Sequence, residues 1–163
     1  MRDLTTRAAR SEDASALTAL CLRSKAHWGY DGAFLKASEP SLTVSTTRIA
    51  EGCVLVAEDK DQRLVGVAAA DPVKDGAFDL TLLFVEPDAI GKGVGGKLFA
   101  AIVELIAREG AKRLLIEADP NAEGFYKRLG ARRIGDAPSS AIPGRTLPLL
   151  EFVIPETPNA RRV

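Results

Sequence analysis

Glycine is concentrated at one point of the sequence, in the segment Gly91-Lys92-Gly93-Val94-Gly95-Gly96. Apolar residues such as Leu98 and Ile102 follow it at helical spacing, so the pattern predicts glycines at the start of a helix. Glycine lets the backbone approach a bound group closely, and the free N–H groups and dipole of a helix start attract anions. Glycine also costs helix stability, so this density favours an anion site, typically for phosphate, over simple close packing of a helix.

Two known phosphate-binding patterns fit parts of this segment. Gly91-x-Gly93-x-x-Gly96 is a literal dinucleotide fingerprint, with Glu117 or Asp119 downstream to bind a ribose hydroxyl. Residues 86–90 nevertheless separate the preceding strand from the glycines, whereas a dinucleotide fold places its turn directly after the strand. The segment also contains the body of a P-loop, but Leu98 stands where a hydroxyl should bind magnesium. Dinucleotide binding therefore stays open as an alternative.

Composition narrows the remaining functions. The chain has 163 residues with 22 Lys plus Arg and 22 Asp plus Glu, which predicts one globular domain, here 1–155, with a flexible tail at 156–163. The balanced charge argues against nucleic acid or a membrane surface as the main partner. A single His and two isolated cysteines give no metal-ligand spacing, so no metal site is expected. Without a signal-peptide core or a run of ~20 apolar residues, a cytoplasmic protein is expected.

Hydrophobic periodicity and turn residues predict a mixed α/β domain. An antiparallel hairpin and a further strand come first, and a strand–helix–strand–helix order with a right-handed crossover follows. The expected architecture is a mixed, mostly antiparallel central sheet flanked by helices. The expected helices are 11–26, a short stretch ending near Pro40, 45–50, the stretch from the glycines to Gly110, and 122–129; the expected strands are 54–58, 64–68, 78–85, 113–117, 131–134 and 147–154.

Several segments together resemble the GNAT superfamily of N-acetyltransferases. They are the strand 82–87, the glycine segment with Leu98, and the segments 117–121 and 125–130, and the resemblance spans about residues 52–135. In that family the glycine loop holds the pyrophosphate of coenzyme A. The family pattern begins with Gln or Arg, where this chain has Ile90, and its two small positions match Gly93 and Gly95. The resemblance implies a GNAT-like acyl-CoA N-acyltransferase fold.

The same resemblance implies acetyl-CoA as co-substrate. Backbone groups near Phe84 and Val85 would hold the pantetheine arm and the thioester carbonyl, and the side chain of Asn121 would bond to the same arm. Asn121 could equally be a helix cap or turn residue. Lys92 and Lys97 could add positive charge near the phosphates. The expected cofactor-binding residues are Phe84, Val85, Gly91, Lys92, Gly93, Val94, Gly95, Gly96, Asn121, Phe125 and Tyr126.

Three residues are candidates for proton transfer. Tyr126 matches the position of the family's usual general acid, and a phenol with an ordinary pKa near 10 stays protonated at neutral pH. Its alternative role is to pack between helix and sheet. The sequence does not decide which residue is the general base. Glu86 and Glu117 are the candidates, because they lie near strand ends where family members often place a carboxylate, although carboxylates at strand ends are commonly just solvated.

The segment containing His27, Trp28 and Tyr30 lies where the family folds two helices over the acceptor pocket. Two aromatic residues and a His on one short loop suit the wall of a pocket for a small, partly apolar amine. The expected function is acetyl transfer from acetyl-CoA to a primary amine of a small molecule or protein, by direct attack in a ternary complex. The alternative from another functional class is an acyl-CoA-binding or sensing domain without efficient transfer. Assembly into a homodimer is left open.

Overall fold

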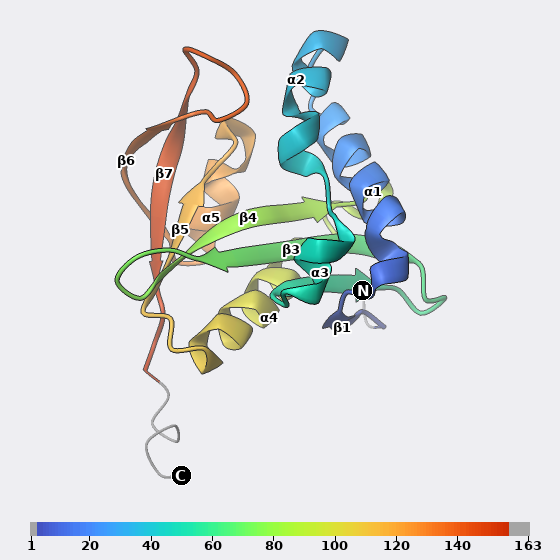
Figure 1. Ribbon diagram of the computed structural model, residues 1–163, viewed down its shortest axis with the longest axis horizontal. Helices are drawn as coiled ribbons and strands as arrows, with labels where there is room; N and C mark the ends of the chain where they lie inside the picture. The colour runs from blue at the N-terminus through green and yellow to red at the C-terminus, as the bar shows by residue number, and fades with distance from the viewer. Residues whose placement is uncertain (1–2, 157–163) are drawn as a thin grey trace.

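The computed structural model describes residues 3–156 (Figure 1). The expected tail at 156–163 therefore lies, apart from Glu156, outside the described residues. The helices are α1 (Ala14–Ala26), α2 (Gly32–Leu42), α3 (Thr46–Ala50), α4 (Val94–Arg108) and α5 (Glu123–Arg128). The strands are β1 (Thr5–Ala8), β2 (Val54–Glu58), β3 (Leu64–Pro72), β4 (Ala77–Val85), β5 (Arg113–Glu117), β6 (Arg132–Pro138) and β7 (Thr146–Val153).

The seven described strands form one sheet in the order β1-β2-β3-β4-β5-β7-β6. Only the β4–β5 pair is parallel, and α4 connects its two strands. The mixed, mostly antiparallel sheet predicted from the sequence is therefore confirmed. In Figure 1, β5, β7 and β6 run steeply across the direction of β3 and β4, as expected for a strongly twisted sheet.

Helices cover both faces of the sheet, and each face has its own apolar cluster. The apolar stripe of α4, including Leu98 and Ile102, packs with Ala68 of β3. On the opposite face, Leu17 of α1 packs with Val67 of the same strand. Adjacent residues of β3 thus alternate between the two clusters, as the geometry of a strand requires. None of the helices within residues 3–156 is long and apolar enough to cross a bilayer.

The strands β4 and β5 separate after a short paired segment. Their register joins residues 77–79 to residues 113–115, although β4 continues to Val85 and β5 to Glu117. In the pairing with β3, Ala70 lies opposite Leu80 and Ala69 opposite Leu82, which makes Thr81 a bulge residue in β4. A bulge bends its strand, and the carboxyl ends of β4 and β5 consequently diverge. This divergence creates the space in which the site lies.

Most predicted elements occur, with four differences. The strand expected over 64–68 continues to Pro72 as β3. β1 was not expected, because four residues give too short a pattern to distinguish a strand. The helix expected to end near Pro40 continues to Leu42, since a proline in the last turn removes only one backbone donor. Pro138, expected in a loop, is the last residue of β6, and it is tolerated there because β6 is an edge strand.

Candidate active site

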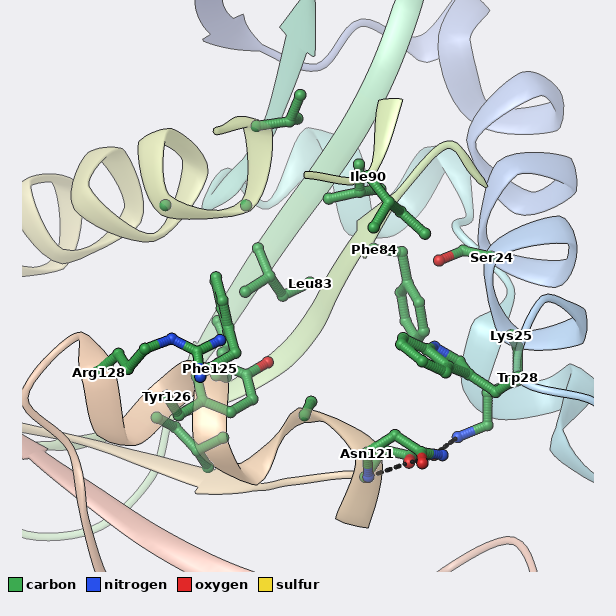
Figure 2. A pocket seen from close by; sticks show the side chains of 18 of the residues that line it. Ser24, Lys25, Trp28, Leu83, Phe84, Ile90, Asn121, Phe125, Tyr126 and Arg128 are labelled. Atoms are coloured by element: carbon green, nitrogen blue, oxygen red, sulfur yellow. Dashed lines mark hydrogen bonds and ion pairs between the residues drawn. The ribbon is translucent and has the colours of Figure 1, made fainter. Parts of the chain in front are cut away.

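A cavity of about 490 Å³ lies between the separated ends of β4 and β5. Its walls come from the end of α1, the end of β4, the start of α4, the end of β5 and the helix α5 (Figure 2). Its volume falls within the ~300–1,000 Å³ range of ordinary ligand pockets. The predicted residues that line it are Trp28, Phe84, Val85, Gly91, Gly93, Val94, Gly95, Gly96, Glu117, Asn121, Phe125 and Tyr126.

The glycine segment forms the start of α4, as predicted. Gly91 and Gly93 have φ angles of 84° and 86°, in the left-handed region that glycine adopts without strain. The hydrogen bond from the Lys97 N–H to the Gly93 carbonyl, 3.1 Å long, closes the first helical turn. The N–H groups of residues 94–96 come earlier in the helix than this first bond, so they are among the donors that a helix start leaves without a partner in the helix. They lie at the cavity, where an anion would meet both these donors and the positive end of the helix dipole.

The two last glycines of the segment serve different purposes. A Cβ atom on Gly95 would lie 3.0 Å from Cζ of Phe125, so this glycine allows the Phe125 ring to pack against α4. A Cβ atom on Gly96 would meet no atom within 4 Å in the described part of the chain. Close packing therefore explains Gly95 and does not explain Gly96. The open space beside Gly96 fits a group bound from outside the chain.

The two lysines of this segment lie apart from the cavity lining. Lys97 Nζ donates a 2.6 Å hydrogen bond to the carbonyl of Leu4, beside β1. Its expected role near a phosphate is thus replaced by a contact that ties the N-terminal segment to α4. Lys92 is exposed, and its charge lowers the pKa of Asp88, behind the stronger effect of Arg63. Backbone N–H groups are therefore the main donors that this segment offers to an anion in the cavity.

Tyr126 lies at the inner wall of the cavity. The residue is only 7% exposed, and its hydroxyl points into the cavity (Figure 2). Burial, and next the negative charge of Asp119, raise the pKa of the Tyr126 phenol. The hydroxyl is consequently protonated at neutral pH and able to donate. Phe125 and Tyr126 both line the cavity, and their rings lie edge to face with an interplanar angle of 71°.

The structure separates the two candidate bases. Glu86 is buried and accepts two hydrogen bonds from the Arg23 guanidinium, at 2.7 Å and 2.8 Å, outside the cavity lining. Glu117 lies at the end of β5 and lines the cavity. Partial desolvation, and next the negative charge of Asp79, raise the pKa of Glu117. A carboxylate with a raised pKa holds a proton more readily, which suits a general base.

Comparisons with known proteins decide the family. The model of the acetyltransferase (GNAT) domain matches residues 26–140. The chain belongs to the GNAT acetyltransferase family. The uncharacterized N-acetyltransferase ycf52 of Gracilaria tenuistipitata var. liui is 33% identical over 75 residues. The match to this relative covers 45% of this chain and 40% of the relative, so the chain spans about two fifths of the relative's length.

Solved structures share the GNAT fold over nearly the whole chain. The PaiA N-acetyltransferase of Thermoplasma acidophilum, in complex with coenzyme A, has a TM-score of 0.75 at 14% identity and covers 93% of this chain and 99% of its own. YncA of Salmonella typhimurium, a putative acetyltransferase with its cofactor acetyl-CoA, has a TM-score of 0.69 at 19% identity. The similarity covers 95% of this chain and 96% of that protein. The fold expected from the resemblance is thereby confirmed, and the dinucleotide-binding alternative does not fit this fold.

The expected acceptor residues of this GNAT chain lie in different surroundings. Trp28 lines the cavity and is 47% exposed. His27 packs edge-on against Trp28, with ring centroids 5.3 Å apart, and lies outside the lining. The hydroxyl of Tyr30 donates a 2.7 Å hydrogen bond to Asp119. Of the three residues, Trp28 is thus the one that faces the cavity directly.

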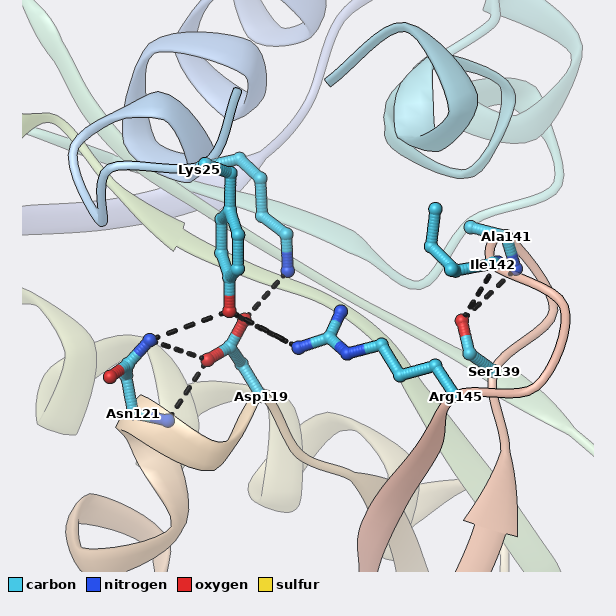
Figure 3. Close-up of polar contacts among 8 residues, drawn as sticks. Lys25, Asp119, Asn121, Ser139, Ala141, Ile142 and Arg145 are labelled. Atoms are coloured by element: carbon cyan, nitrogen blue, oxygen red, sulfur yellow. Dashed lines mark hydrogen bonds and ion pairs between the residues drawn. The ribbon is translucent and has the colours of Figure 1, made fainter. Parts of the chain in front are cut away.

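A polar cluster that sequence reasoning missed joins α1 to the segment after β5 (Figure 3). Lys25 Nζ donates a 2.8 Å hydrogen bond to Asp119, and Asn121 donates to the same carboxylate from its backbone N–H at 2.9 Å and its side-chain amide at 3.0 Å. Burial alone would raise the pKa of Asp119, but these donors and Tyr30 outweigh it and lower the pKa. Ninety-four positions separate Lys25 from Asp119, so no local motif could reveal their contact.

Proposed function

We propose that this chain is an acetyl-CoA-dependent N-acetyltransferase that acetylates a primary amine by direct attack in a ternary complex. One observation carries the proposal: the free N–H groups at the start of α4 and the Tyr126 hydroxyl face one cavity between separated strands. The first feature suits the pyrophosphate of coenzyme A, and the second suits protonation of its sulfur. Family membership supports this reaction class.

The residues of the cavity fit acetyl-CoA at two places. The space beside Gly96 accepts a phosphate group that a side chain at this position would displace. The edge of β4 beyond Asp79 is released from β5, so backbone groups near Phe84 and Val85 can bond to an extended pantetheine arm, much as an added strand would. When bound, acetyl-CoA supplies the acetyl group as a reactive thioester. Ile90 lines the cavity at the loop's first position and can add only apolar contact.

Two side chains provide the proton transfers in this proposal. Glu117 accepts a proton from the acceptor ammonium, because only the neutral amine has a lone pair for attack. Tyr126 donates its phenolic proton to the departing sulfur, and the phenolate that remains takes up the second proton, which the nitrogen loses as the amide forms. A backbone N–H of the released β4 edge stabilises the charge that develops on the carbonyl oxygen, as donors do in other acyl transfers. None of these steps requires a histidine.

Glu117→Gln is expected to lower kcat/KM by roughly 10²-fold, because glutamine cannot accept the proton. In the unchanged protein, kcat/KM should fall as pH falls through the raised pKa of Glu117, since the protonated carboxyl is inactive as a base. This acid limb should therefore lie above the ordinary range of a glutamate. Initial rates measured from pH 4.5 to 9, with acceptor below KM, report the limb.

Glu86→Gln is the matched control, since Glu86 is the other carboxylate at a strand end and lies against Arg23. This substitution should leave the acid limb in place and lower thermal stability instead. The assignment of the base is wrong if Glu86→Gln abolishes the limb and Glu117→Gln does not.

A titration distinguishes the proposal from the binding of another nucleotide. Trp28 is the single tryptophan of the chain and lines the cavity, so its fluorescence reports directly on ligands there. Acetyl-CoA should bind with a stoichiometry of one and change the fluorescence, with NAD showing neither effect; calorimetry measures the affinities independently. Binding of NAD without binding of acetyl-CoA would contradict the proposal. Binding of acetyl-CoA without turnover on any amine would favour a sensor.

A further inference from the structure

Arg145 lies beside Asp119, a residue that lines the cavity, and has no part in the proposed transfer. It lies directly before β7, and its side chain is 22% exposed. Its guanidinium carbon is 4.8 Å from the ring centroid of Phe34 and 5.4 Å from that of Tyr30, two rings that stack 4.1 Å apart. One guanidinium nitrogen donates a 3.1 Å hydrogen bond to the Tyr30 hydroxyl. These contacts fix the guanidinium in place.

The charges around this guanidinium do not balance. Asp119 is the carboxylate nearest to it, and one of its oxygens lies 3.9 Å from the Arg145 nitrogen, beyond hydrogen-bond distance. Asp119 already accepts hydrogen bonds from Lys25, from Tyr30 and twice from Asn121, which fills its ~4 lone-pair sites. Two cations therefore share one saturated carboxylate. The cluster carries an excess of one positive charge, and Arg145 keeps N–H donors for a further acceptor (Figure 3).

This cationic cluster belongs to the same cavity as the proposed base. Lys25, Asp119 and Leu147 line the cavity, and Arg145 precedes Leu147 by two residues, a spacing that places both on one side of an extended chain. Glu117 precedes Asp119 by two residues, or about 7 Å at ~3.3 Å per residue. The cation Lys25 and the carboxylate of Glu117 thus line one cavity, and Arg145 lies beside them next to Asp119.

We propose that the acceptor is a small amino-carboxylate, an amino acid or a close relative, whose carboxylate binds Arg145 beside Lys25 while its amine lies at Glu117. The proposal rests on the acetyltransferase function proposed above and adds the class of acceptor. A guanidinium presents parallel donors that match the two oxygens of a carboxylate, and a net charge of one suits a monoanion. The same excess charge disfavours polyamines and other polycations.

The test compares amino acids with their amides. A panel of L-amino acids, each paired with its α-carboxamide, is assayed with acetyl-CoA by release of free thiol. The amide keeps the size of the acceptor and loses the negative charge. In the unchanged protein, kcat/KM for the preferred amino acid should exceed that for its amide by on the order of 10- to 100-fold, the effect of one charged hydrogen-bonded pair.

Arg145→Gln should bring this ratio close to one, and Arg145→Lys, which keeps the charge without the planar donor pair, should give an intermediate ratio. Arg108→Gln, an exposed arginine of α4 paired with Glu104, is the control and should leave the ratio unchanged. Unfolding midpoints of all variants check folding, and the lysine variant keeps the test valid if the glutamine variant does not fold.

The outcomes separate this inference from the proposed function. If amides or simple amines react as well as amino acids, or if the ratio in Arg145→Gln and Arg145→Lys equals that of the unchanged protein, the inference is overturned and the acetyltransferase function stands. If no primary amine of any class releases thiol, although acetyl-CoA binds, the proposed function is overturned and the inference falls with it.

Discussion

Tyr126→Phe should lower kcat by roughly 10²- to 10³-fold, the usual contribution of a general acid. The substitution removes one oxygen and keeps the ring that packs against Phe99 and Phe125. The affinity for acetyl-CoA should therefore change little. Stability should not fall, because the hydroxyl has no hydrogen-bond partner within residues 3–156 and its removal exposes no unpaired group. Steady-state kinetics, a binding titration and thermal unfolding measure the three effects.

The result separates a catalytic role from a packing role. A residue that only packs would give a variant with unchanged kcat, or one with lowered stability and weakened acetyl-CoA binding together. Thiol release that survives Tyr126→Phe undiminished would refute the assignment of the acid. Because the pKa of this phenol is raised, the unchanged protein should also keep its acid protonated well above neutral pH.

Gly96→Glu should weaken acetyl-CoA binding by at least about 10²-fold without weakening the fold. The new carboxylate would occupy the space beside the N–H groups of α4 and repel a pyrophosphate there. For the helix alone the change is favourable: replacing glycine gains up to about 1 kcal/mol of helix propensity, and a negative charge in the first turn interacts well with the dipole. Calorimetric titration and urea unfolding measure the two opposite effects.

Two alanine variants control this result. Gly96→Ala places a methyl group in open space and should weaken binding only a few-fold. Gly95→Ala places a methyl group 3.0 Å from the Phe125 ring, so it should disturb packing as well as binding. If Gly96→Glu binds acetyl-CoA as well as the unchanged protein, the start of α4 is not the phosphate site.

The sequence predicted best those features whose information is local. The glycines and the helix they begin lie within one continuous segment, and the position of Tyr126 follows from a motif close to it in the chain. The order of strands and helices predicted the mixed sheet as well. Local patterns of hydrophobicity and glycine were sufficient for these features, because the helix start and the strand alternation are determined by neighbouring residues.

Features formed between distant segments could not be predicted in this way. The separation of β4 from β5 depends on a register and a bulge that only the paired strands define. The choice between Glu86 and Glu117 depended on Arg23, which lies 63 positions before Glu86 and occupies its carboxylate. Arg145 contacts Tyr30 across 115 positions. Such contacts arise from the folded arrangement and leave no spacing pattern in the sequence.

The most direct test of the account is a joint count of both products of the reaction. The protein is incubated with acetyl-CoA and a panel of primary amines, and free thiol and acetylated amine are measured in the same samples, the latter by mass spectrometry. The account predicts one thiol released per acetylated amine, with transfer only when acetyl-CoA and an accepting amine are both present. Saturable binding of acetyl-CoA with no acetylated amine from any acceptor would contradict it.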